Sequence, residues 1–302
     1  MKLHWMMGVV LLAACGAQET RHGGSGGAGG TGSGGVGNGQ GGDGQQAQGC
    51  SKMDILFVVD NSGSMSEEQT NLAQNFPKFI DVLNAYTTGA GQPLDYHVGL
   101  TTTSLTDTTP IPLPIPIPVP PGDDGALRNQ ASCGMTRPWI ERTDANPAQQ
   151  FSCVAQVGTD GSGQEQPLGA ARLALTDRIA DGKNAGFLRD DALLAIVVLT
   201  DEDDQSVDPA NSSSAELPVE DFIMTYDAAK KGHDRWAAAI VAGPTACMSS
   251  FGSAEEAVRL KDFVAKSGKQ AVFSSICDGD LAKSLDEALH TFQTACDSFP
   301  IG

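Results

Sequence analysis

The chain has 302 residues and a mass of 31.3 kDa, which is enough for one large domain or two small ones. Its 37 acidic and 19 basic residues give a formal net charge of −18, which argues against a nucleic-acid partner because phosphate binding needs clustered Lys and Arg. No apolar run after residue 15 approaches the roughly 20 residues of a membrane-spanning helix. We therefore predict that the chain beyond residue 15 does not span a membrane.

Residues 1–15 have the pattern of an export signal, in which the basic Lys2 precedes an apolar stretch that ends Leu12-Ala13-Ala14-Cys15. This stretch resembles a bacterial lipobox. The resemblance implies that Cys15 is lipidated and that the residues before it are removed, so that lipid is the only link to a membrane. The expected location is the cell envelope, in the outer membrane, facing the periplasm or the surface. An ordinary signal peptide, in which Cys15 is incidental, is the alternative.

Residues 16–49 hold 16 glycines, with Ser, Gln and Asn between them. Such a segment cannot bury enough apolar surface to offset its conformational entropy, so we predict a flexible linker. The globular domain is then residues 50–302, with an insertion at residues 104–136. Within the insertion, prolines alternate with apolar residues over 111–120 and predict an extended arm that either selects a partner or is a tolerated surface loop.

Residues 50–302 alternate between strand and helix patterns. The run from Asp54 to Asp60 is almost continuously apolar, which is typical of a strand buried on both faces. Ser66 and Gln69 fit a capping box that opens a helix, although Pro77 should kink or restart that helix. The remaining pattern predicts, in chain order, strand 96–102, strand 137–143, helix 147–157, helix 168–180, strand 192–200, helix 219–230, strand 236–242, helix 254–267, strand 270–276 and helix 281–295.

This order of elements predicts an α/β fold: a Rossmann-like, doubly wound, mostly parallel central sheet with helices on both faces. Two of the buried strands end in oxygen-rich turns, Asp60-x-Ser62-x-Ser64 and Thr200-Asp201. Sheets of this kind bind ligands at the carboxyl ends of their strands, and hard divalent cations take oxygen ligands. We therefore predict a cation site that the two turns share at one edge of the sheet.

These two motifs, each behind an apolar strand, resemble the von Willebrand factor A (VWA) domain and its metal-ion-dependent adhesion site (MIDAS). The resemblance covers roughly residues 52–295 and implies a VWA fold with one short antiparallel strand. It implies that Ser62 and Ser64 bind Mg²⁺ or Mn²⁺ directly and that Asp60 and Asp201 act mainly through water. A carboxylate of the partner would complete the coordination shell.

The third loop of the site departs from the family pattern. The register of the helix that follows places the family's threonine position at Glu165, whereas the only threonine of the loop, Thr159, lies six residues earlier. We favour Glu165 and keep Thr159 as the alternative. A carboxylate there would bind the cation more tightly, weaken its pull on a partner carboxylate and bring Ca²⁺ into consideration. Glu202 stands where the family has glycine, and Asp203 and Asp204 are either outer ligands or surface residues.

Six cysteines remain if Cys15 carries lipid, and an even number in an exported chain predicts three disulfides. In the topology that the resemblance implies, Cys50 and Cys296 lie at the edge opposite the metal, and Cys247 and Cys277 follow neighbouring strands at the metal edge. Cys133 and Cys153 are left to pair. The predicted disulfides are Cys50–Cys296, Cys247–Cys277 and Cys133–Cys153.

No motif in the sequence supports catalysis, because the five histidines are scattered and there is no HExxH, GxSxG or Walker lysine. His97 alternates with apolar residues in a strand and is interpreted as a packed side chain. We predict a non-enzymatic, lipid-anchored domain whose metal captures an acidic side chain of a protein or a surface polymer. One alternative is a purely structural ion with Glu165 in the open position, and another is a metal-dependent hydrolase. The sequence identifies neither the partner nor the oligomeric state.

Overall fold

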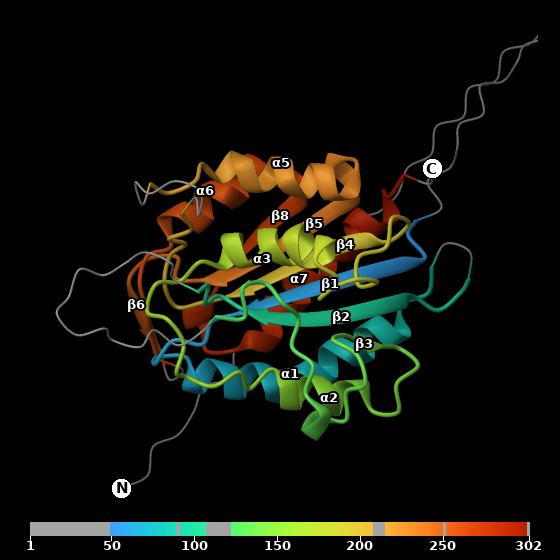
Figure 1. The fold of residues 1–302 in the computed structure, drawn as a ribbon, viewed down its shortest axis with the longest axis horizontal. Coiled ribbons are helices and arrows are strands. Elements are labelled where there is room, and N and C mark those ends of the chain that lie inside the picture. Colours follow the sequence, from blue (N-terminus) through green and yellow to red (C-terminus); the bar gives the residue numbers. More distant parts are fainter. Residues whose placement is uncertain (1–48, 89–90, 107–121, 208–214, 250–251, 301–302) are drawn as a thin grey trace, which may run out of the picture. The chain divides into compact units, whose positions relative to one another are not determined.

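A six-stranded sheet with the order β3-β2-β1-β4-β5-β8 forms the centre of the molecule (Figure 1). The structure is a computed structural model that describes residues 49–88, 91–106, 122–207, 215–249 and 252–300. Neighbouring strands pair in parallel, except that β3 is antiparallel to β2. The strands are β1 (Lys52–Val59), β2 (Asp95–Thr102), β3 (Ile140–Glu141), β4 (Leu193–Leu199), β5 (Trp236–Ala242) and β8 (Ala271–Ser275).

Helices cover both faces of this sheet, so the predicted doubly wound α/β class is confirmed, including its one short antiparallel strand. One face packs against α1 (Ser66–Ala85), α2 (Pro147–Val154) and α7 (Leu281–Asp297). The other packs against α3 (Pro167–Leu175), α5 (Val219–Lys230) and α6 (Val258–Ser267). The remaining elements are α4 (Asp177–Ala180), β6 (Cys247–Ser249), β7 (Gly252–Ala254), η1 (Ala131–Cys133), η2 (His233–Arg235), η3 (Gly268–Gln270) and η4 (Ile276–Asp278).

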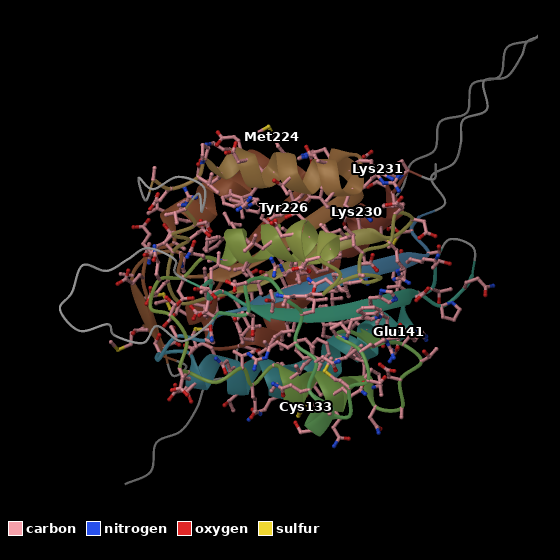
Figure 2. The ribbon with its side chains drawn as sticks, in the orientation of Figure 1. Cys133, Glu141, Met224, Tyr226, Lys230 and Lys231 are labelled. Atoms are coloured by element: carbon pink, nitrogen blue, oxygen red, sulfur yellow. A yellow bond between two sulfur atoms is a disulfide. The ribbon has the colours of Figure 1, made fainter. Side chains whose placement is uncertain are left out.

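Side-chain alternation along the strands divides the core into two layers. In β1, Ile55 and Phe57 belong to the layer under α1 and α7, whereas Leu56 and Val58 belong to the layer under α3 and α5. The covering helices are amphipathic: on α5, Tyr226 is buried toward the sheet and Met224 is exposed (Figure 2).

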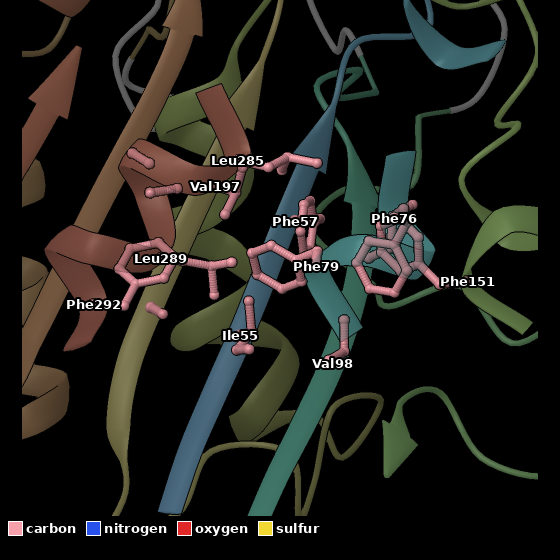
Figure 3. Close-up of a cluster of buried hydrophobic side chains, with 14 of the residues drawn as sticks. Ile55, Phe57, Phe76, Phe79, Val98, Phe151, Val197, Leu285, Leu289 and Phe292 are labelled. Carbon is pink, nitrogen blue, oxygen red and sulfur yellow. The ribbon is translucent and has the colours of Figure 1, made fainter. Parts of the chain in front are cut away.

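Phe57 lies at the centre of the first layer (Figure 3). Its ring meets those of Phe76 and Phe79 from α1 at centroid distances of 5.6 and 5.7 Å, and that of Phe151 from α2 at 4.7 Å. Each fully buried Phe contributes about 1.5 to 3 kcal/mol of hydrophobic stabilisation. Since Phe57 is three residues before Asp60, this aromatic cluster also fixes the strand that leads into the site.

Helix α1 starts at Ser66 as predicted, but the predicted capping box is wrong: the N-cap position is Met65, which makes no side-chain cap. Gln69 uses its amide elsewhere, as described below. Pro77 does not end or restart the helix. A proline removes the hydrogen bond to the carbonyl four residues earlier, and here that carbonyl, of Ala73, accepts a hydrogen bond of 2.7 Å from Ser152 Oγ on α2.

Several element boundaries differ from the prediction, and the helix predicted for residues 147–157 ends at Val154. The helix predicted for residues 168–180 is divided into α3 and α4 at Thr176, whose φ and ψ of −121° and −82° are not helical. The helix predicted from residue 254 starts instead at Val258, because the antiparallel β6–β7 hairpin occupies the residues before it. The strand predicted for residues 137–143 is only Ile140–Glu141.

Three disulfides join Cys50 to Cys296, Cys133 to Cys153 and Cys247 to Cys277, the same pairs as in the sequence analysis. Cys15, residues 16–48 and the proline run at 111–120 lie outside the described residues. Within the described part of the chain, no helix has both the length and the apolar character needed to cross a membrane.

Candidate metal centre

Asp60 connects the two motifs at the carboxyl ends of β1 and β4. These strands pair in register up to Val59 and Leu199, so the next residues of both strands are neighbours. Asp60 N donates to Leu199 O at 2.9 Å. The Asp60 carboxylate accepts hydrogen bonds of 2.7 Å from Thr200 Oγ1 and from the backbone N–H of Ser62. The buried carboxylate thus stabilises the turn that carries both serines and joins it to β4.

The two serine hydroxyls lie together at this edge, with Ser62 Oγ and Ser64 Oγ 3.2 Å apart. Ser62 is buried and Ser64 is exposed. The Ser64 side chain also interacts with the Asp201 carboxyl group and lowers its pKa, so the two side chains are near each other. Residues of both motifs, 140 positions apart in the sequence, therefore present their oxygens within hydrogen-bonding reach of one another.

The third loop brings Glu165 to the same place. Its carboxylate is buried and accepts a hydrogen bond from Thr103 Oγ1, and the negative charge of Asp60 raises its pKa. Thr159 lies in the same loop, but no hydrogen bond joins its hydroxyl to any of these residues in the described part of the chain. Of the two sequence candidates, Glu165 is the one whose carboxyl group is influenced by the charge of Asp60.

Two side chains hold the first and third loops together: Gln69 of α1 and Ser104, which follows β2. Gln69, a buried residue of α1, donates to Asp60 O at 2.9 Å and to Gly158 O at 2.8 Å and accepts from Gly158 N at 3.2 Å. Ser104 Oγ donates to Asn61 Oδ1 at 2.8 Å and accepts from Ser162 N at 2.9 Å. This network holds the loops in place without using the side chain of any predicted metal-site residue.

Three further carboxylates surround the predicted ligands. Glu68 is buried in the first turn of α1, close to Gly252 of β7. Glu202 is half-buried, and Glu255 is exposed but fixed beside Asp201 by a hydrogen bond of 2.8 Å from Glu255 N to Asp201 O. Sequence analysis missed Glu68, Glu255 and Thr103.

Signals for two of the missed residues exist in the sequence. Glu68 is four residues before Leu72, on the apolar face of α1, and a carboxylate on the buried face of a helix needs a partner. Thr103 belongs to the run Thr101-Thr102-Thr103-Ser104 that ends β2, the strand next to β1. Nothing in the sequence indicates Glu255, because only the β6–β7 hairpin brings it to the site.

Burial and mutual repulsion raise the pKa values of these carboxyl groups. Burial, followed by the negative charge of Asp60, raises the pKa of Glu165 to about 9. Burial raises the pKa of Asp201 to about 6 against the hydrogen bond from Ser64, and raises those of Glu68 and Glu202 to about 7 with the help of Asp201. The principal charges that act on these four groups are all carboxylates.

The donor set fits a hard divalent cation. Glu68 Oε2, Glu165 Oε1 and Asp201 Oδ1 are buried without a hydrogen-bond partner, and their residues are 3%, 0% and 4% exposed. Unpaired buried carboxylate oxygens are costly unless a cation neutralises them. Among the described residues, no three His, Cys, Asp or Glu side chains by themselves form a metal-binding group.

The carboxylates of Asp203 and Asp204 bind the starts of two helices, and Asp204 is not a surface residue, which was one of the two options of the sequence analysis. Asp203 accepts hydrogen bonds from the N–H groups of Arg259 and Leu260 at the start of α6. Asp204 is buried, accepts from Leu168 N at the start of α3 at 2.9 Å and pairs with Arg259 Nε at 2.9 Å. Acidic side chains stabilise helix N-termini, so these two fix α3 and α6 next to the site.

The interpretation of His97 as a packed side chain agrees with its surroundings. The ring is buried, stacks on Trp139 at 5.3 Å, and places Nδ1 2.9 Å from Phe187 O. It lies on β2 near the start of the strand, which is the edge of the sheet opposite the candidate metal centre.

No protein-family model matches the chain, and no curated protein matches it. Solved structures of proximal thread matrix protein 1 (PTMP1) from the mussel byssus are similar to it. A second crystal form of PTMP1 has a TM-score of 0.44 at 11% identity and covers 82% of this chain and 49% of that chain. PTMP1 with a zinc-occupied MIDAS motif gives the same values. A further PTMP1 structure has a TM-score of 0.35 at 13% identity.

The chain spans about half the length of the PTMP1 structures that it matches. Because the TM-scores of these three structures are below 0.5, their likeness assigns neither a fold nor a function to this chain. The fold class rests on the strand order of the chain itself, and the site rests on its own side chains.

Proposed function

We propose that the chain is a non-catalytic, VWA-type binding domain that uses a divalent cation to bind a ligand at the carboxyl edge of its sheet. The observation that carries this proposal is the meeting of three distant turns, through Ser62, Ser64, Glu165 and Asp201, around the Asp60 carboxylate. Hydroxyl and carboxylate oxygens are the ligands that Mg²⁺, Mn²⁺ and Ca²⁺ take.

Each residue has a definite part in this proposal. Ser62 and Ser64 ligate the ion directly, Glu165 ligates it from the third loop, and Asp60 and Asp201 position the hydroxyls and neutralise the charge of the ion. The bound ion would offer a remaining coordination position to an oxygen of the ligand.

The site occurs in a chain with a lipobox-like start and a Gly-rich segment before the domain. We propose that lipid on Cys15 attaches the protein to the cell envelope and that the linker extends the domain away from the membrane toward a protein or surface-polymer ligand. Palmitate labelling of the wild type and of Cys15→Ser tests the anchor independently of the metal site.

Metal titration tests the binding proposal. Titration calorimetry with Mg²⁺, Mn²⁺ and Ca²⁺ is expected to show one ion bound by the wild type and none by Asp60→Ala or by the double variant Ser62→Ala/Ser64→Ala. Asp81→Asn, a change at an exposed position of α1, serves as the control and should bind normally. Adhesion of protein-coated beads to cell envelopes should disappear in EDTA and with Asp60→Ala. Adhesion that is indifferent to both treatments contradicts the proposal.

A second candidate function follows from Glu165. Its carboxylate contacts Asp60 and can fill the coordination position that a ligand would otherwise use, which would make the ion a purely structural element. In that case, EDTA lowers the melting temperature but leaves adhesion to cell envelopes unchanged. The two candidates therefore give opposite results in one pair of measurements.

A further inference from the structure

Of the three disulfides that the structure describes, only the Cys133–Cys153 bridge has an exposed cysteine. Cys153, in the last turn of α2, is exposed, and Cys133, at the end of η1, is 9% exposed. Both cysteines of the Cys50–Cys296 bridge are buried, and both of the Cys247–Cys277 bridge are half-buried against the first core layer. A thiol must reach a sulfur atom to exchange with it, so exposed disulfides are the labile ones.

A surface pocket of about 390 Å³ lies beside this bridge, and both of its cysteines belong to the lining. The other lining residues are all uncharged and include Asn146, Gln149 and Gln150. An attacking thiolate therefore meets no carboxylate in the lining of the pocket, although the chain as a whole has a net charge of −18. Side-chain amides can also hydrogen-bond to the backbone of an incoming polypeptide.

The fold around the bridge has contacts that do not depend on it. Phe151 of α2 is fully buried in the aromatic cluster of the first layer, and Ser152 Oγ donates to Ala73 O at 2.7 Å. Gln150 Nε2 donates to Gly134 O at 2.8 Å and so joins α2 to the residue after η1. The bridge spans only 20 residues, so breaking it frees the unfolded chain less than breaking a longer one does. An opened bridge should therefore leave the domain folded and its two cysteines close together.

We propose that Cys133–Cys153 is a thiol–disulfide exchange site, which a protein dithiol of the oxidoreductase class opens by attack on Cys153 Sγ. The exposed cysteine, the uncharged pocket beside it and the independent attachment of α2 support reversible opening of this bridge alone. The proposal concerns a site separate from the candidate metal centre and does not depend on cation binding.

The exchange has two steps. A thiolate of the partner forms a bond to Cys153 Sγ while the bond from Cys153 Sγ to Cys133 Sγ breaks, and Cys133 leaves as a thiolate that takes up a proton. Gln130 Oε1, 3.2 Å from Cys133 Sγ, is placed to accept a hydrogen bond from the new thiol. The second thiol of the partner then attacks the mixed disulfide and releases Cys153 as a thiol. The partner dithiol is oxidised to a disulfide, and the bridge is reduced to two thiols.

A trapping experiment tests which sulfur is attacked. Thioredoxin with its second active-site cysteine changed to serine forms the mixed disulfide but cannot complete the second step. It is incubated with the full chain, free thiols are alkylated, and the peptides are analysed by mass spectrometry. The expected products are a mixed disulfide on Cys153 and an alkylated thiol on Cys133, with no trapped complex for Cys133→Ser/Cys153→Ser. A mixed disulfide on any other cysteine, or none at all, overturns the proposal.

Equilibration with mixtures of reduced and oxidised dithiothreitol tests whether this bridge opens alone. Cys133–Cys153 should be half-reduced at a ratio of reduced to oxidised dithiothreitol about tenfold or more below the ratio that half-reduces Cys247–Cys277. The far-UV circular dichroism should not change over this first step, and Cys50–Cys296 should stay oxidised. Joint reduction of the three bridges, earlier reduction of Cys247–Cys277, or loss of the dichroism signal when Cys133–Cys153 opens contradicts the proposal.

Discussion

The ionisation of the Glu165 side chain has a large effect on the stability of the metal-free protein. Glu165 is completely buried, its Oε1 has no partner, and its pKa is raised to about 9 by burial and by Asp60. In the absence of a cation the folded protein must keep this group protonated at neutral pH, whereas the unfolded chain ionises it. The group therefore destabilises the metal-free fold increasingly as the pH rises from its ordinary pKa of 4.5 to about 9.

Glu165→Gln should stabilise the metal-free protein and weaken its binding of the metal ion. The amide keeps an acceptor for Thr103 and has no charge to be repelled by Asp60. In EDTA at pH 8 the free energy of unfolding should rise by about 1 to 3 kcal/mol. Affinity for Ca²⁺ or Mg²⁺ should fall by about 10 to 100-fold. Urea unfolding and calorimetry measure the two effects.

Thr159→Val is the matched comparison for this variant, because Thr159 is the other candidate of the same loop. The valine is nearly isosteric and should alter neither metal affinity nor metal-free stability. If Thr159→Val abolishes metal binding and Glu165→Gln does not, the third ligand is Thr159 and the assignment of Glu165 is wrong.

At the scale of elements, α5 is joined to the amino edge of the sheet by its last residue, Lys230. The side chain is buried, and its ammonium donates to Arg189 O in the segment before β4. Arg189 in turn pairs with the buried Asp54 of β1 at 2.8 Å. Lys230 lies at the end of α5 away from β6, so this network is remote from the candidate metal centre (Figures 1 and 2).

Lys230 should make stability rise with pH. Burial lowers its pKa from 10.5 to about 8, so the unfolded chain binds more protons than the folded protein between these values. Stability therefore increases with pH in that window. Relative to Lys230→Met, the wild type should gain about 2 kcal/mol between pH 7 and pH 9.5. Urea unfolding at both pH values measures this, with the exposed Lys231→Met as control. If the free energy of unfolding changes equally with pH in the wild type and in Lys230→Met, the pKa of Lys230 is not lowered and the prediction is wrong.

At the scale of the whole molecule, disulfides connect regions that the sheet alone does not. Cys50, before β1, is bonded to Cys296 in the last turn of α7, a separation of 246 residues. The Cys133–Cys153 bridge spans only 20 residues, from η1 to α2. In the chain-entropy model a longer closed loop contributes more stability, because it restricts the unfolded chain more.

Removing the long-range bridge should therefore cost more than removing the short one. The chain-entropy model gives about 5 kcal/mol for Cys50→Ser/Cys296→Ser and about 3 kcal/mol for Cys133→Ser/Cys153→Ser. Urea unfolding of both double variants in EDTA checks the order. An equal or larger loss from the Cys133–Cys153 pair would mean that native contacts near η1, and not loop closure, set the contribution of these bridges.

Much of this architecture could be predicted because a strand that is buried on both faces is a continuous apolar run in the sequence. The apolar runs of β1, β4 and β5 predicted these strands to within two residues, and α5 was predicted at its observed bounds. The prediction failed where a residue distant in the sequence formed a hydrogen bond that the local sequence does not indicate. Ser152 satisfies the carbonyl that Pro77 leaves free, so the helix continues, and Gln69 leaves its expected cap to connect Asp60 with Gly158.

By itself the sequence determined the strand and helix order and the two oxygen-rich turns, because hydrophobic periodicity and short motifs are properties of neighbouring residues. Only the tertiary structure decided which acids surround the site and which support the helices beside it. Glu68 and Glu255 come to the site through α1 and the β6–β7 hairpin, whereas Asp203 and Asp204, adjacent to the motif, bind helix N-termini instead. The role of a carboxylate depends on what lies within a few ångströms of it, and chain folding sets those neighbours.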